Sequence, residues 1–174
     1  MKQGEKSQHA RVKQKPLWRC PLCGHRFVTR NLWHSCGTFR LSDHFARSQP
    51  EVRKLYRSLV KLIRSFGPVE IYPQKTRIVF LVRVRFVGVA VRKSYLLMAF
   101  WLTRRIEDPR ILRVQSLYPL VHIHEVRIDS SKDIDATLRR WLREAYAVGR
   151  QEHLDQRRLA NKRGSKAVSL GGQR

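Results

Sequence analysis

The chain of 174 residues is poor in acidic residues and lacks the common sequence motifs of catalysis. It has 13 aspartates and glutamates against 37 lysines and arginines, which gives a formal net charge of +24. It contains no phosphate-binding Gly-x-x-x-x-Gly-Lys-Ser/Thr loop, no Gly-x-Gly-x-x-Gly and no Gly-x-Ser-x-Gly. Its carboxylates form no cluster along the chain. This pattern leaves an enzymatic activity open but weighs against one.

Long apolar segments and paired cysteines are also missing. The longest uninterrupted apolar run, at 95–102, has eight residues, whereas a membrane helix needs about 20. The first 15 residues are polar and basic and lack the apolar core of a signal peptide. The chain has three cysteines, an odd number, and two of them form a Cys-x-x-Cys pair, which favours a metal site over disulfides. We therefore expect a cytoplasmic protein with no membrane partner.

The remaining composition supports a folded domain with basic ends. Apolar residues make up 42% of the chain, which is enough for a buried core. Residues 1–19 and 150–174 carry +5 each, which leaves +14 for the part between them. We predict a disordered basic tail at 1–19, a zinc-binding head at 20–46, an α+β domain at 47–150, and a helix extension with a second disordered basic tail at 151–174.

The α+β domain begins with a well-marked helix. Ser48 and Glu51 have the spacing of a capping box. Apolar side chains then recur at helical spacing from Val52 to Phe66, and the Gly-Pro pair at 67–68 ends the segment. These signals predict one amphipathic helix with its apolar stripe against a core.

Alternating apolar residues predict about five strands after this helix. The segment 95–102 is apolar on both faces and is expected at the centre of the sheet. Ser130 is then expected to cap a second helix, with Asp133 and Asp135 favourable in its first turn. The order of elements predicts a two-layer sandwich, with both helices on one face of an antiparallel sheet. The expected strands are 69–72, 76–86, 95–102, 110–118 and 120–129.

The strongest chemical signal is a Cys-Pro-Leu-Cys-Gly sequence followed by His-Ser-Cys. Cys20 and Cys23 present two thiolates to one ion, and His34 and Cys36 complete a tetrahedral set of three sulfurs and one nitrogen. Four protein ligands leave no open position, so we expect a structural Zn²⁺ ion. His44, seven residues beyond Cys36, is the alternative fourth ligand. A redox Cys-x-x-Cys is the less favoured alternative.

Basic residues gather on the first helix and on the head. On the helix they face away from the apolar stripe, and no acidic residue follows Glu51 on that face. Like charges four residues apart destabilise a helix slightly, so an anionic partner would explain the pattern, although a solvated surface is about equally consistent with it. The candidate nucleic-acid contacts are Arg26, Arg30, Arg53, Arg57, Lys61 and Arg64.

A second group of polar residues is compatible with a pocket on the sheet. Strand alternation places His122 and His124 on one side, where they could bind a ligand, although two hydrogen-bonded structural histidines are the favoured interpretation. The residues that would share such a pocket are Lys75, Arg77, His122, His124 and Tyr146.

The order of these motifs resembles a family of small bacterial proteins described as domain of unknown function 5655. The likeness covers about residues 18–153 and rests on CPLCGHRFVTRNLWHSC, LSDHF, PEVRKLYRSL, GPVEIYPQKTRIVFLVRVRF and HIHEVRIDSSKDIDATLRRWLREAYAVG. The resemblance implies a bacterial cytosolic protein, often with a zinc-type head, and no established activity. Positions typical of the family are Cys20, Cys23, His34, Cys36, His44, Lys75, Thr76, Arg77, His124 and Tyr146.

These observations together favour a zinc-containing protein that binds nucleic acid through its basic surface. RNA is favoured over duplex DNA because the sequence shows no recognition helix and no basic region followed by heptads. The alternatives are a small-ligand-binding protein or enzyme that uses the histidine pocket, and an adaptor for an acidic protein.

Overall fold

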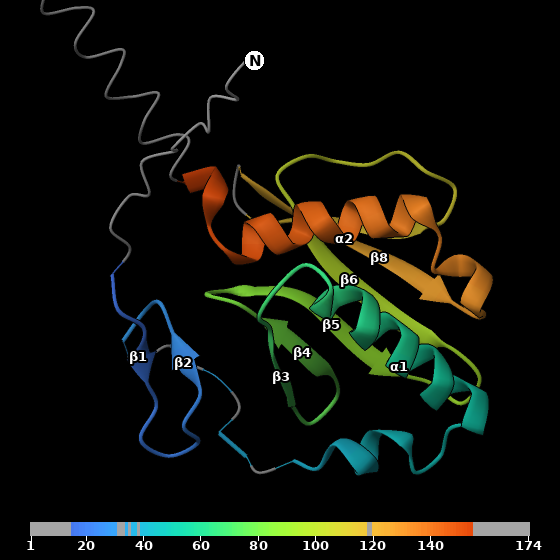
Figure 1. Cartoon of the computed structure of the whole chain (residues 1–174), viewed down its shortest axis with the longest axis horizontal. Helices are drawn as coiled ribbons and strands as arrows, with labels where there is room; N and C mark the ends of the chain where they lie inside the picture. The colour runs from blue at the N-terminus through green and yellow to red at the C-terminus, as the bar shows by residue number, and fades with distance from the viewer. Residues whose placement is uncertain (1–14, 31–33, 35, 38, 118–119, 155–174) are drawn as a thin grey trace, which may run out of the picture.

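One six-stranded antiparallel sheet with two helices forms the body of the protein (Figure 1). The computed structural model describes residues 15–30, 34, 36–37, 39–117 and 120–154, so most of both predicted tails lies outside the described residues. The predicted α+β class is confirmed, with six strands in this sheet instead of about five. In spatial order the strands are β3 (Glu70–Pro73), β4 (Ile78–Leu81), β5 (Arg85–Val91), β6 (Leu96–Leu102), β8 (Val121–Ile128) and β7 (Ile111–Leu117).

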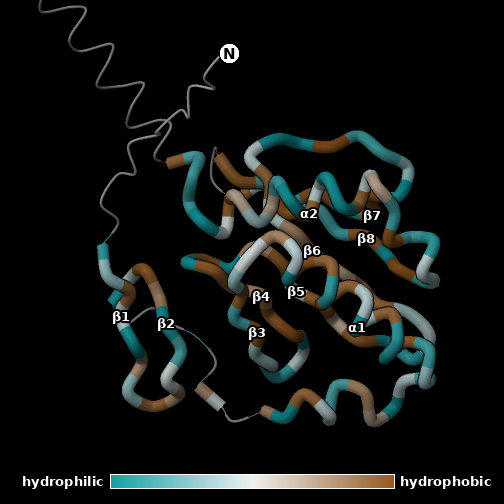
Figure 2. Tube along the Cα trace, viewed as in Figure 1, coloured by the Kyte–Doolittle hydropathy of each residue, from teal (hydrophilic) through white to brown (hydrophobic). Residues whose placement is uncertain are grey.

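Both helices pack on the same face of the sheet, as predicted. Helix α1 (Pro50–Arg64) buries the stripe that runs from Val52 to Ile63, and α2 (Ala136–Gly149) buries a stripe centred on Trp141 and Leu142. These stripes meet Phe80, Val89, Met98 and other apolar side chains of the sheet in one core. Figure 2 shows the apolar residues of the central strands behind the two helices. Among the described helices, none is both long and apolar enough to cross a membrane.

Strand β6 lies inside the sheet because both of its faces are apolar. It pairs with β5 on one side and β8 on the other. Phe100 faces the helices, whereas Trp101, on the other face, is only 8% exposed. On that second face Tyr72, Val79 and Leu81 form a small separate cluster. The segment that the sequence predicts at the centre of the sheet is therefore found there.

The predicted strand 76–86 is wrong as one element, because the chain breaks it into β4 and β5. The backbone N–H groups of Arg83 and Val84 both donate to the carbonyl of Gly149, at 3.0 and 3.1 Å. The register also shifts between Phe80 and Leu81. The segment 82–84 therefore forms backbone hydrogen bonds with the end of α2 instead of with a neighbouring strand. This accounts for the additional strand.

The predicted helix caps are also corrected. The hydroxyl of Ser48 donates to the carbonyl of Phe45 and closes the short 3-10 helix η1 (Leu41–Phe45), so α1 begins at Pro50, after Gln49. Ser130 caps the 3-10 turn η2 (Ser131–Asp133) instead of α2. The cap of α2 is Asp135, whose carboxylate accepts from the N–H of Leu138 at 2.7 Å.

The contact between Gly149 and the core leads to a stability prediction. A Cβ at Gly149 would lie 2.7 Å from Cδ1 of Phe86, whose side chain is fully buried. Helix propensity alone favours alanine over glycine by about 1 kcal/mol. We expect Gly149→Ala instead to destabilise the protein by about 1–3 kcal/mol, because the tightly packed core cannot accept the extra methyl. Urea unfolding measures this, and a gain in stability would contradict it.

Candidate metal centre and basic helix face

The Cys-x-x-Cys turn lies between two short strands, β1 (Trp18–Arg19) and β2 (Arg26–Phe27), which pair with each other. The N–H of Cys20 donates to the carbonyl of His25, and the N–H of Gly24 donates to the carbonyl of Cys20, both at 2.9 Å. Gly24 has a φ of 75°, which glycine adopts without strain. The hairpin formed by β1 and β2 therefore begins within the segment predicted as a tail, because β1 includes residues 18–19.

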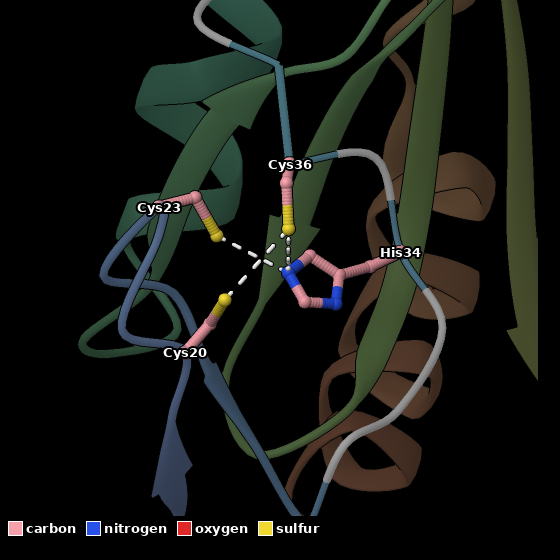
Figure 3. A group of neighbouring side chains, drawn as sticks. All are labelled: Cys20, Cys23, His34 and Cys36. Atoms are coloured by element: carbon pink, nitrogen blue, oxygen red, sulfur yellow. Dashed lines mark hydrogen bonds between the residues drawn. The ribbon is translucent and has the colours of Figure 1, made fainter.

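Four side chains converge below this turn, with their sulfur and nitrogen atoms all within 4.8 Å of one another (Figure 3). The sulfurs of Cys20 and Cys36 are 3.7 Å apart. Nε2 of His34 lies 3.2 Å from the sulfur of Cys23 and 2.9 Å from that of Cys36. Around an ion bound tetrahedrally at about 2.3 Å, two sulfurs lie about 3.8 Å apart. These residues therefore lie close enough to hold one metal ion.

The electrostatics of the cluster also favour a cation. Backbone hydrogen bonding from Cys23 lowers the pKa of Cys20 to about 6. Burial raises the pKa of Cys36 to about 11, and the neighbouring charges of Cys20 and Cys23 act in the same direction. Thiolates that lie side by side repel one another, and a divalent cation between them removes this repulsion while releasing the thiol protons.

The alternative ligand His44 does not join this group. It lies in η1, and among the described residues the group consists of three cysteines and His34. The ring of His25 also turns away, because it packs on Tyr72 with ring centres 4.0 Å apart. The geometry thus favours His34 as the fourth ligand.

One carboxylate on the sheet contacts two residues of the head. Glu70 of β3 lies 3.2 Å from Nδ1 of His25 and 3.6 Å from a guanidinium nitrogen of Arg26. The ring of Tyr72 also contacts the head, which lies beside the edge strand β3 (Figure 1). Sequence reasoning missed Glu70, because nothing in its neighbourhood along the chain distinguishes it from any other half-exposed acid.

We expect Glu70→Ala to loosen the head without unfolding the sheet. Ion pairs this exposed contribute about 1 kcal/mol or less, so global stability should change little. Amide hydrogen exchange should rise at residues 18–27 and stay unchanged in α1. Glu125→Ala is the matched control, because Glu125 is a half-exposed acid on β8. Unchanged amide exchange in the head would show that the head stays attached to the sheet without the Glu70 carboxylate, with Tyr72 as a remaining contact.

Beyond the first turn, which holds Glu51, the charged residues on the exposed face of α1 are all basic. At about 100° per residue, its cations fall within an arc of roughly 100° around the helix. None of them forms an ion pair with a carboxylate in the described part of the chain, whereas Arg104 and Arg127, for example, do. Arg53 instead lies over the ring of Phe45, 5.1 Å from its centre. The cations of this basic face are Arg53, Lys54, Arg57, Lys61 and Arg64.

The two candidate contacts on the head are separate from the basic face. Arg26 already pairs with Glu70, and Arg30 follows it in the exposed loop after β2. Figure 1 shows β1 and β2 beside β3, away from α1. The structure therefore brings four of the six predicted nucleic-acid contacts together on one helix.

The residues of the candidate pocket do not share one cavity. Arg77 lies over Gly88, on the face of the sheet opposite the helices. His124 is fully buried on the helix face, so the sheet separates these two side chains. The Tyr146 hydroxyl donates to the carbonyl of Pro68 at 3.0 Å. Lys75 is exposed in the turn between β3 and β4.

Both histidines of this group have hydrogen-bonding partners. This fits the prediction that they have a structural role and do not bind a ligand. The N–H of Ile106 donates to Nε2 of His124 at 2.9 Å, which requires a neutral ring. Burial lowers the pKa of His124 below its ordinary value. Nδ1 of His122 lies 3.0 Å from the hydroxyl of Ser116. The contact to Ile106 joins residues 18 apart, and no local pattern indicates it.

Comparison with known proteins identifies the domain. No curated protein and no solved structure matched the chain. The family model described as domain of unknown function DUF5655 matches residues 41–149, from η1 to the end of α2. The Cys/His cluster precedes this region. The match covers more than half of the chain, so the protein belongs to the DUF5655 family.

Proposed function

We propose that this protein binds nucleic acid, with RNA preferred, through the basic face of α1, and carries a structural Zn²⁺ ion in its head. The metal is assigned from the ligand type, since three thiolates and one imidazole suit zinc. Cys20, Cys23, His34 and Cys36 would occupy all four tetrahedral positions. The zinc ion would then hold the head together and take no part in a reaction.

The observation that carries the nucleic-acid proposal is the row of unpaired cations on α1. Five positive charges lie on this surface without a carboxylate partner in the described residues. These side chains therefore repel one another. Phosphates would relieve this repulsion, and binding would gain from the release of counterions. α1 packs on the sheet beside α2, which suits a shape-adaptable RNA better than insertion into a major groove.

Charge reversal on α1 tests the proposal. We expect Arg53→Glu, Arg57→Glu and Arg64→Glu together to abolish tight binding of a labelled RNA at physiological salt. The slope of log affinity against log salt should become shallower by about two to three, because each phosphate contact contributes about 0.7–0.9. Fluorescence anisotropy titrations at several salt concentrations measure both quantities.

A matched variant separates this site from net charge. Lys75→Glu, Lys132→Glu and Arg139→Glu together change the total charge equally at three exposed positions away from α1. This control should retain most of the affinity. Equal loss in both variants would mean that binding is a general effect of the positive surface, and the proposal for α1 would be wrong.

A further inference from the structure

The basic face of α1 carries two hollows whose linings are partly apolar. The first lies at the start of the helix, where Phe45 and Pro50 adjoin Arg53. The second lies toward the end, where Tyr56 and Val60 adjoin Lys61. Each has a volume of about 370 Å³, and both are open to solvent. Purely electrostatic contact with phosphates does not require such apolar surface.

Cations border both hollows at regular intervals. Arg57 belongs to the lining of both. Because an α-helix rises 1.5 Å per residue, Arg53, Arg57 and Lys61 follow one another at about 6 Å along the axis. This is the scale of the phosphate repeat in an extended nucleic-acid strand. The lining of each hollow therefore combines positive charge with apolar residues.

We propose that the ligand of this face is a single-stranded nucleic acid, with phosphates on the cations and unpaired bases in the two hollows. This inference rests on the proposed function and names its substrate class. In a duplex the bases are stacked and paired inside, so their faces cannot reach a surface hollow. Grooves that bind single strands typically combine a positive track with apolar or aromatic base contacts.

Three probes of equal length test the inference on the full-length protein. They are a labelled single-stranded RNA of twelve nucleotides, the same strand annealed to its complement, and an abasic strand with the same phosphates. We expect the single strand to bind about tenfold or more tightly than either of the others in anisotropy titrations at physiological salt, because only it offers free bases.

A pair of substitutions on α1 tests the hollow itself. Val60→Asp places a carboxylate in the second hollow, whereas Ser58→Asp adds the same charge to an exposed position outside the arc of cations. The ratio of single-strand to abasic affinity should fall toward one in Val60→Asp and stay unchanged in Ser58→Asp. Far-UV circular dichroism verifies that both variants fold.

The outcomes separate the two proposals. Equal binding of all three probes, weakened alike by charge reversal on α1, would overturn the single-strand inference and leave nucleic-acid binding standing. Absence of binding to any probe at physiological salt would overturn both. A preference for the duplex would also overturn the inference, because paired bases cannot enter the hollows.

Discussion

Substitution of Cys36 by serine is expected to abolish metal binding and unfold the head while the DUF5655 domain stays folded. Cys36 supplies one of four donor atoms, and its sulfur lies 3.7 Å from that of Cys20. A structural zinc ion contributes about 10–16 kcal/mol of apparent binding energy, much of which is folding energy for a small module. Among its described residues, the other contacts of the head include the packing of Phe27 on Trp18 and His34 and the contacts to Glu70 and Tyr72.

Metal analysis and hydrogen exchange together check this expectation. The purified wild-type protein should carry about one zinc ion per chain, and Cys36→Ser close to none. Exchange should become fast at residues 18–27 and remain slow in β5 and β6, whose core belongs to a separate cluster. Wild-type protein that carries no zinc would contradict the metal assignment.

Two histidine variants decide the fourth ligand. His34→Ala should lose zinc as Cys36→Ser does, because Nε2 of His34 lies within the cluster. His44→Ala should retain it, since His44 lies in η1. Zinc loss should also set in as the pH falls, because protons compete with the metal for thiolates and imidazole. If His34→Ala retained zinc, another residue would have to be the fourth ligand.

Replacement of His124 by alanine should destabilise the domain by about 3 kcal/mol or more. The ring is fully buried beside Phe100, with ring centres 5.5 Å apart, so truncation leaves a cavity. It also removes the acceptor of the Ile106 N–H, and an unsatisfied buried donor costs about 1–3 kcal/mol. Urea unfolding measures the loss. His122→Ala is the control and should cost less than about 1 kcal/mol, because His122 lies only half-buried against Ser116.

The same histidine makes stability depend on pH in a defined direction. Burial lowers the pKa of His124 in the folded state, whereas the unfolded chain has the ordinary value of about 6.5. The unfolded state therefore binds the proton more readily, and this contribution to stability is complete above about pH 6.5 and lost progressively below it. We expect His124→Gln, which keeps an acceptor for Ile106, to flatten this part of the profile. An unchanged profile would show that another group is responsible.

The sequence by itself determined the features that depend on near neighbours. The three cysteines and His34 lie within 17 residues, so their spacing alone indicated a tetrahedral site. The stripe from Val52 to Ile63 and the apolar segment 95–102 likewise predicted α1 and the inner strand β6, because helix and strand periodicity are local properties.

The tertiary structure decided whatever depends on partners distant in the chain. The strand predicted at 76–86 breaks because Arg83 and Val84 donate to Gly149, more than 60 residues later. The sheet separates Arg77 from His124, so these two residues of the candidate pocket cannot share one cavity. Glu70 contacts the head only because folding brings it to His25. Local periodicity indicates which residues face the core. Backbone hydrogen bonds and ion pairs between distant segments depend on which segments the packed fold brings together.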